Sequence, residues 1–300
     1  MTPGRQPAAA DTIRAAATPA APRTAESRRA WLRALELTAP IAATPERILP
    51  TVIDELAARL DAAPALLSER ECLSYRALAE RVNRYAHWAL EHDIGIGDVV
   101  ALFMPNRPEY LAAWLGITRV GGVVALLNAN LTGPSLAHGI GLVAPRHVIA
   151  AAELVAPVTT ALGSGRDTPT VWVHGDGHEE LPRLDRELER YSAVAPELIG
   201  RRPTLDDWAL YIYTSGTTGL PKAARVSHFR LMQWSHWFAG LMGVRPIDRM
   251  YNCLPMCHSV GGVLATGATL VGGGSVVIRQ SFSARAFWDD VVRWDCTLFQ

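Results

Sequence analysis

The run WALYIYTSGTTGLPK, residues 208–222, sets the architecture that the rest of the chain is expected to follow. Its first six residues, 208–213, are aromatic, aliphatic or β-branched and predict a buried strand. Its last nine residues, 214–222, hold four hydroxyl side chains, two glycines and Lys222. Glycines allow backbone N–H groups to turn toward a guest, and hydroxyls together with such donors can surround phosphate oxygens. The run therefore predicts a strand followed by a phosphate-binding loop, to which Lys222 adds a positive charge.

A Walker A loop is the main alternative for a segment of this composition. That motif needs two glycines separated by four residues and a Gly-Lys-Ser/Thr ending. Here the glycines are Gly216 and Gly219, Pro221 precedes Lys222, and Ala223 follows it. The hydroxyl that would hold Mg²⁺ in a Walker loop is absent from that place, so the sequence predicts a phosphate loop of another class. A Ser/Thr/Gly-rich turn without a ligand remains the other alternative.

Strand and helix patterns alternate along the first half of the chain. Short apolar runs at residues 99–104, 123–127 and 147–151 are typical of buried strands, and helical patterns at residues 108–118 and 135–142 separate them. Strands and helices in this order predict right-handed βαβ units and a parallel sheet. We therefore expect the α/β fold class.

Composition divides the chain into three parts. Residues 1–30 are rich in Ala, Pro, Thr and Arg without apolar periodicity and are expected to form a disordered tail. Residues 31–200 are expected to form a first α/β subdomain, which includes a helix at residues 50–60 and a helix capped by Ser74. A charge-rich stretch then leads into residues 201–300, which are expected to begin a second α/β subdomain that carries the phosphate loop.

Charge and cysteine content exclude several classes of protein. The 29 basic and 29 acidic residues balance, which argues against a nucleic-acid partner because such proteins present a basic surface. Four cysteines in 300 residues do not make a disulfide framework and indicate reduced thiols in a cytoplasmic protein. Residues 120–145 and 250–278 carry no Asp, Glu, Lys or Arg, but Gly, Pro, Asn and His interrupt both. We interpret them as buried core rather than membrane spans and leave peripheral membrane contact open.

Residues 213–222 resemble the signature loop of the adenylate-forming (AMP-binding) superfamily, which includes acyl-CoA synthetases, luciferases and peptide-synthetase adenylation domains. The motifs NRPEY at 106–110, LNANL at 127–131 and LPMCHS at 254–259 are similar to the fatty-acid-transport and very-long-chain branch of the acyl-CoA synthetases. The resemblance covers residues 30–300 and only the N-terminal portion of the family. It implies the N-terminal large domain of an adenylate-forming enzyme, with parallel-sheet subdomains and an end inside the second one.

The resemblance also implies a reaction, in which ATP and a fatty acid form an acyl-adenylate and coenzyme A then displaces AMP. It implies ATP, Mg²⁺ and coenzyme A as cofactors or co-substrates, and fatty acid and nucleotide as partners. Thr214 matches a position that helps to hold Mg²⁺. Lys222 and His258 match catalytic positions, the first steadying the departing pyrophosphate and the second lying near the acyl carboxylate. The positions that match residues cradling the β- and γ-phosphates are Ser215, Gly216, Thr217, Thr218 and Gly219.

Alternatives stay open around His258. The imidazole could be a satisfied core residue rather than a catalyst. Cys253 and Cys257 beside it suggest metal ligands, but a zinc site needs a fourth ligand that no second cluster supplies. Gly261 and Gly262 either leave a tunnel open for a long acyl chain or pack a helix closely against the sheet.

Two alternatives also remain for the chain as a whole. One is another adenylate-forming enzyme that acts on aryl or amino acids. The other is a nucleotide-binding fragment without catalysis, because the family's later motifs would follow Gln300 and a truncated form is expected.

Overall fold

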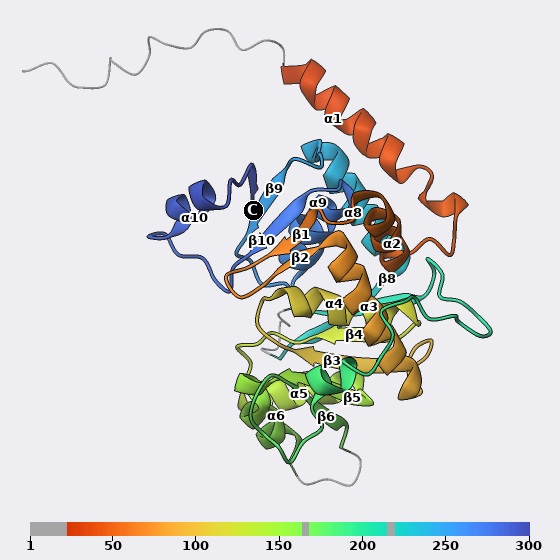
Figure 1. Cartoon of the computed structure of the whole chain (residues 1–300), viewed down its shortest axis with the longest axis vertical. Helices are drawn as coiled ribbons and strands as arrows, with labels where there is room; N and C mark the ends of the chain where they lie inside the picture. Colours follow the sequence, from red (N-terminus) through yellow and green to blue (C-terminus); the bar gives the residue numbers. More distant parts are fainter. Residues whose placement is uncertain (1–22, 164–167, 215–219) are drawn as a thin grey trace, which may run out of the picture.

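The computed structural model describes residues 23–163, 168–214 and 220–300 (Figure 1). The α-helices there are α1 (Arg23–Thr38), α2 (Leu49–Leu60), α3 (Tyr75–Glu91), α4 (Pro108–Arg119), α5 (Gly133–Val143), α6 (Val155–Leu162), α7 (Leu184–Leu188), α8 (His228–Met242), α9 (Ala268–Val271) and α10 (Phe287–Arg293). The strands are β1 (Pro64–Leu67), β2 (Cys72–Ser74), β3 (Val99–Phe103), β4 (Val123–Leu126), β5 (His147–Ala151), β6 (Thr170–His174), β7 (Trp208–Thr214), β8 (Lys222–Ser227), β9 (Arg249–Asn252), β10 (Ser275–Ile278) and β11 (Leu298–Phe299). Short 3-10 turns at Ile41–Ala43 and Ala152–Leu154 and a π-helical segment, η3 (Val260–Gly267), complete the elements.

Two mostly parallel sheets carry the fold. Sheet A has the order β11-β9-β10-β1-β2, and only its β1–β2 pair is antiparallel. Sheet B has the order β6-β5-β3-β4-β7-β8, and only its β7–β8 pair is antiparallel. The predicted α/β class with parallel sheets is confirmed.

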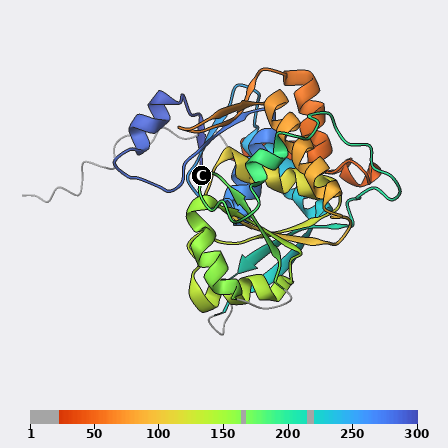
Figure 2. The ribbon, with the colours of Figure 1, turned by 60° about the horizontal axis from the view of Figure 1, so that its bottom comes forward.

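The elements stack in layers, with α2, α3 and α4 between the two sheets (Figure 1). Helices α5 and α6 cover the other face of sheet B, and α10 packs on the other face of sheet A (Figure 2). In β3, Val100 and Leu102 join the central core, whereas Ala101 and Phe103 join the core beneath α5 and α6. Because both faces of the strands are buried, their sequences are continuous apolar runs.

The sheets do not divide the chain at residue 200. Strands β7 and β8 complete sheet B, although the rest of that sheet comes from residues 99–174. Strands β1 and β2 belong to sheet A with β9, β10 and β11. The division into subdomains 31–200 and 201–300 stays a prediction, and the two sheets do not follow it, because parallel pairing joins strands that are distant in sequence.

Residues 23–30 of the expected tail form the start of α1 (Arg23–Thr38), and residues 1–22 lie outside the described residues. Helix α1 packs on α8 through buried Ala34, which lies directly over Gly240, while the rings of Trp31 and Trp237 meet edge to face. A helix that packs through one alanine and one glycine has no broad apolar stripe, so its pattern resembles that of a solvated segment.

The two uncharged runs, 120–145 and 250–278, form short strands, helices and turns of the core. Over the described ranges, we find no helix whose length and apolar content would let it cross a bilayer.

Candidate active site

Thr214 and Lys222 face each other across the antiparallel β7–β8 pair. Thr214 ends β7, Lys222 begins β8, and the two residues are register partners. Both side chains are exposed, and no carboxylate of the described residues pairs with Lys222. The predicted phosphate-cradling residues 215–219 lie outside the described residues. The two ends of the predicted loop thus lie side by side at the carboxyl end of β7.

The segment from Thr214 to Lys222, which we call the β7–β8 hairpin, leads into a strand and not into a helix. A phosphate bound here would therefore lack the positive end of a helix dipole, on which Walker loops depend. Lys222 is also the only lysine among the 29 basic residues of the chain. A lysine ammonium is a compact charge on a flexible stem, whereas an arginine is a rigid fork, so lysine suits a group that must follow a moving phosphate.

Helix α5 supports the β7–β8 hairpin from one side. The hydroxyl of Tyr213 donates a buried hydrogen bond of 2.6 Å to the carbonyl of Gly139. The Nε2 atom of His138 lies 3.2 Å from the carbonyl oxygen of Pro221. The side chain of His138 also lines a cavity of about 450 Å³ together with Lys222. No local sequence pattern indicates that His138 supports this turn.

His258 lies in the turn between β9 and η3. Its backbone N–H donates to the carbonyl of Pro255 at 3.1 Å, and its carbonyl accepts from the N–H of Gly262 at 2.9 Å. The imidazole is exposed, whereas the neighbouring Met256 and Cys257 are buried. His258 is thus not a satisfied core histidine. Among the described residues, no hydrogen bond or ion pair joins it to Thr214 or Lys222.

The glycines that follow His258 are closely packed. A Cβ atom placed on Gly261 would lie 2.5 Å from the carbonyl oxygen of Pro255 and 2.8 Å from that of Leu254. One placed on Gly262 would meet the carbonyl oxygen of Met256. These positions therefore serve a close approach of two backbone segments, which favours the packing interpretation over an open tunnel.

The two thiols near His258, those of Cys253 and Cys257, are buried. Burial raises the pKa of Cys257 to about 11 and also raises the pKa of Cys253, so both thiols stay protonated at neutral pH. The described ranges contain no group of three or more His, Cys, Asp or Glu side chains that could hold a metal ion. Thr214 offers Mg²⁺ one hydroxyl only, and that ion requires six oxygen ligands, so the described residues do not by themselves build a magnesium site.

A cavity of about 570 Å³ opens where the carboxyl ends of strands from both sheets meet. It is lined by residues that follow or end β1, β3, β6 and β10: Ser68, Glu69, Arg70, Glu71, Asn106, Arg107, Pro108, Glu109, His174, Gly175, Ile278, Arg279, Gln280, Ser281 and Ser283. Ligands of open α/β sheets bind outside the carboxyl ends of the strands. The position of this cavity is therefore consistent with a substrate crevice.

A buried ionic network supports the wall of this cavity at the start of α4. Glu109 Oε2 accepts a hydrogen bond of 2.7 Å from Arg81, and Oε1 accepts one of 2.6 Å from the hydroxyl of Tyr85. His174 Nε2 lies 3.5 Å from Oε1. Burial alone would raise the pKa of Glu109, but the hydrogen bond and charge of His174, with those of Arg81 and Tyr85, lower it to about 2. The network therefore holds an ionised carboxylate directly after the loop that contains Asn106.

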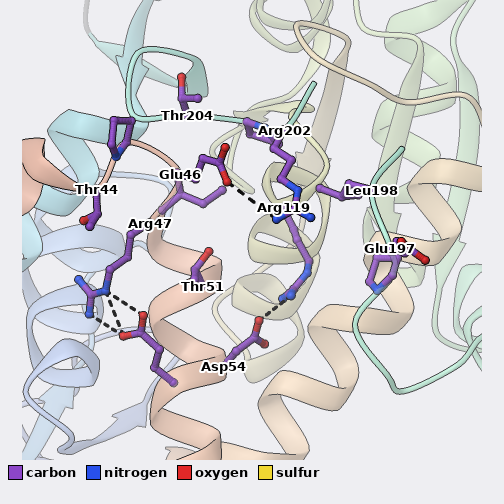
Figure 3. A pocket seen from close by; sticks show the side chains of 15 residues that line it. Thr44, Glu46, Arg47, Thr51, Asp54, Arg119, Glu197, Leu198, Arg202 and Thr204 are labelled. Carbon is purple, nitrogen blue, oxygen red and sulfur yellow. Dashed lines mark hydrogen bonds and ion pairs between the residues drawn. The ribbon is translucent and has the colours of Figure 1, made fainter. Parts of the chain in front are cut away.

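Another cavity of the described residues lies away from these strand ends. It has a volume of about 720 Å³ and lies between α2, the end of α4 and residues 196–204 (Figure 3). Figure 3 shows Arg119 directed at Asp54, and these two side chains form an ion pair of 2.5 Å. Arg47 forms a second ion pair, of 2.6 Å, with Glu55. The cavity contains none of the predicted site residues. Because these arginines are already paired with carboxylates, it is a poor site for a triphosphate.

Comparisons with known proteins agree on one family. The AMP-binding enzyme family profile matches residues 53–300. Long-chain fatty acid transport protein 1 of Rattus norvegicus is 36% identical over 258 residues, which are 84% of this chain and 40% of that protein. The very long-chain fatty acid transport protein of Cochliobolus heterostrophus is 32% identical over 238 residues, which are 79% of this chain and 36% of that protein. The chain thus spans less than half the length of these curated relatives.

Solved structures show the same architecture. A long-chain-fatty-acid-CoA ligase (FadD1) from Archaeoglobus fulgidus aligns with a TM-score of 0.75 at 21% identity, covering 85% of this chain and 51% of that one. ATP-bound MatB from Rhodopseudomonas palustris aligns with a TM-score of 0.72 at 26% identity, covering 83% of this chain and 48% of that one.

Proposed function

The chain belongs to the family of AMP-binding enzymes, and from this premise we propose that the complete protein activates a long-chain fatty acid with ATP and transfers it to coenzyme A. The observation that carries this proposal is the β7–β8 hairpin. It places an exposed hydroxyl and the only lysine of the chain side by side at the carboxyl end of a buried strand. Such an arrangement suits a polyphosphate that must be held and then released.

In the proposed first step, a carboxylate oxygen of the fatty acid attacks the α-phosphorus of ATP. The bond from that phosphorus to the bridging oxygen breaks, and pyrophosphate leaves with the electron pair. Negative charge grows on the leaving phosphates, and the ammonium of Lys222 neutralises it. Little covalent chemistry is required of the protein, so charge neutralisation and positioning supply the rate acceleration. Mg²⁺ would be held mainly by the phosphate oxygens, since Thr214 is the one ligand assigned to it.

In the proposed second step, the sulfur of coenzyme A attacks the acyl carbon, and AMP leaves. In the first step, we assign His258 to contact with the reacting carboxylate and the α-phosphate. Its exposed imidazole on the carboxyl side of sheet A supports this assignment. The names of the relatives at 32–36% identity support a long-chain substrate rather than an aryl or amino acid.

The test is acid-dependent exchange of pyrophosphate into ATP, measured on the complete gene product. Palmitate and a very-long-chain fatty acid are each compared with benzoate and with a mixture of amino acids. We expect exchange that requires a long-chain fatty acid, and thioester formation when coenzyme A is added. Exchange supported only by aryl or amino acids would replace the fatty-acid assignment, and ATP binding without any exchange would favour a non-catalytic nucleotide-binding protein.

A further inference from the structure

Asn106 lies at the junction of the two sheets, three residues after β3 ends. Its Nδ2 atom donates to the carbonyl of Leu254 at 2.8 Å and to the carbonyl of Arg279 at 3.0 Å. Its Oδ1 atom accepts from the backbone N–H of Met256 at 2.8 Å. Asn106 follows a strand of sheet B, whereas all three partners follow strands of sheet A. One amide side chain thus connects the carboxyl ends of both sheets.

A second asparagine holds the same segment from within sheet A. Asn252, the last residue of β9, is fully buried and accepts from the N–H of Leu254 at 3.1 Å. It donates to the carbonyl of Gly261 at 2.9 Å and to the hydroxyl of Thr266 at 3.0 Å. Leu254 is therefore held at its N–H by Asn252 and at its carbonyl by Asn106.

We propose that Asn106 is a positioning residue, which fixes the turn bearing His258 against sheet B and so against the β7–β8 hairpin. This inference rests on the role given to His258 in the proposed function. An asparagine amide offers two donors and two acceptor lone pairs, and Asn106 uses both donors and one lone pair on backbone groups. Two of those groups, at Leu254 and Met256, belong to the turn that leads to His258, and the third, at Arg279, follows β10. The exposed imidazole makes no hydrogen bond to a described residue, so its position depends on its backbone.

Displacing a reacting group by about 1 Å can cost about a hundredfold in rate, whereas the substrates still bind. The proposal therefore predicts a loss in kcat rather than in the KM for ATP. If Asn106 had only a structural role, its substitution would lower the temperature of unfolding without a loss in kcat that exceeds the change in the KM for ATP.

The variants are Asn106→Ala and Asn106→Asp in the complete protein, with Asn83→Ala as the matched control. Asn83 also donates from Nδ2 to a distant backbone carbonyl, that of Ala193 at 2.8 Å, but it makes no contact with the turn of His258. Asn106→Asp keeps the acceptor for Met256 and places a carboxylate oxygen against two carbonyls. We expect kcat for adenylation to fall at least about tenfold in Asn106→Ala and further in Asn106→Asp. Asn83→Ala should leave kcat unchanged below its unfolding temperature.

A double-mutant cycle tests whether Asn106 acts through His258. The loss in kcat caused by Asn106→Ala should be at least about tenfold smaller in the His258→Ala background than in the wild type, because the imidazole that Asn106 positions is then absent. Equal losses in the two backgrounds would overturn the proposal, and so would an unchanged kcat in Asn106→Ala.

Amide hydrogen exchange of peptides that cover residues 253–260 provides a readout independent of activity. Loss of one hydrogen bond to the Met256 N–H should speed exchange there about tenfold in Asn106→Ala and not in Asn83→Ala. Unchanged exchange would overturn the inference even if activity fell. If the wild type shows no acid-dependent turnover, the proposed function fails, and hydrogen exchange still decides whether Asn106 holds the turn.

Discussion

The β7–β8 hairpin and the turn that carries His258 both follow a buried strand, yet they are held in different ways. The hairpin is defined by adjacent residues, because Thr214 and Lys222 are register partners and the strand leads directly into the loop. The turn of His258 also depends on a distant residue, Asn106, which follows a strand of the other sheet and bonds Leu254 and Met256. A motif of local residues can therefore be identified from sequence, whereas a site residue held by distant partners acquires its geometry only in the folded chain.

The largest effect is expected at Lys222 in the β7–β8 hairpin, where a substitution should slow adenylation without changing stability. Lys222→Ala should lower kcat for adenylation about a hundredfold to a thousandfold, because it removes the ammonium that neutralises the charge growing on the leaving pyrophosphate. The exposed side chain contributes little to folding, so the unfolding temperature should stay the same. Single-turnover formation of acyl-adenylate provides the rate, and Arg230→Ala, which removes an exposed charge on α8, is the control. A loss confined to the KM for the fatty acid would contradict the role of Lys222.

A second change tests the buried ionic network of Glu109, which lies directly after the loop that contains Asn106. Glu109→Gln should reduce the free energy of unfolding by about 3 kcal/mol at pH 7, because it leaves the partly buried Arg81 without its buried partner. The folded-state pKa of Glu109, about 2, lies below its ordinary value of 4.5. The wild type therefore gains stability from Glu109 above about pH 4.5 and loses it as the pH falls toward 2.

The difference in the free energy of unfolding between Glu109→Gln and the wild type should accordingly shrink as the pH is lowered from about 4.5 toward 2. Urea unfolding at a series of pH values measures it. Glu55→Gln breaks the exposed pair with Arg47 and should cost less than about 1 kcal/mol. A pH-independent difference for Glu109→Gln would show that the carboxylate is not ionised in the folded protein.

The smallest effect distinguishes close packing from an open tunnel after His258. Gly261→Ala should destabilise the protein by about 2 kcal/mol, because the new methyl group meets the carbonyls of Leu254 and Pro255. Gly141→Ala is the control, since its Cβ atom would meet nothing within 4 Å and α5 should gain stability there. Thermal unfolding measures both. If Gly261→Ala were neutral and only shortened the preferred acyl chain, the tunnel interpretation would be restored.

The sequence predicted what depends on neighbouring residues. The strand at 147–151 has the expected bounds, the helix after β3 begins at Pro108, and Ser74 caps α3 by accepting from the N–H of Ala77 at 3.1 Å. Residues 23–30, assigned to the tail, are helical instead, and the sequence did not indicate this because α1 packs through small residues. The roles of Thr214, Lys222 and His258 stay predictions.

Long-range features could not be predicted in this way. No local pattern indicates that Asn106 reaches Leu254, or that Glu109 draws Arg81 and Tyr85 around it. One signal was available, since Asn106 follows the short apolar strand β3 and Asn252 ends the short, mostly buried strand β9. A polar amide at the carboxyl end of a buried parallel strand is expected to bond backbone groups of the neighbouring loops.

The pairing of β1 with β10 has a consequence for synthesis. Leu66 has Val276 as its register partner, about 210 residues later in the chain. At the usual pace of a ribosome, ~5–20 residues per second, β1 is complete ~10–40 s before its parallel neighbour is made. During that interval its apolar edge has only β2 as a strand partner, so the nascent chain should need protection from a chaperone. Translation speed over residues 70–275 is then expected to influence the yield of folded protein.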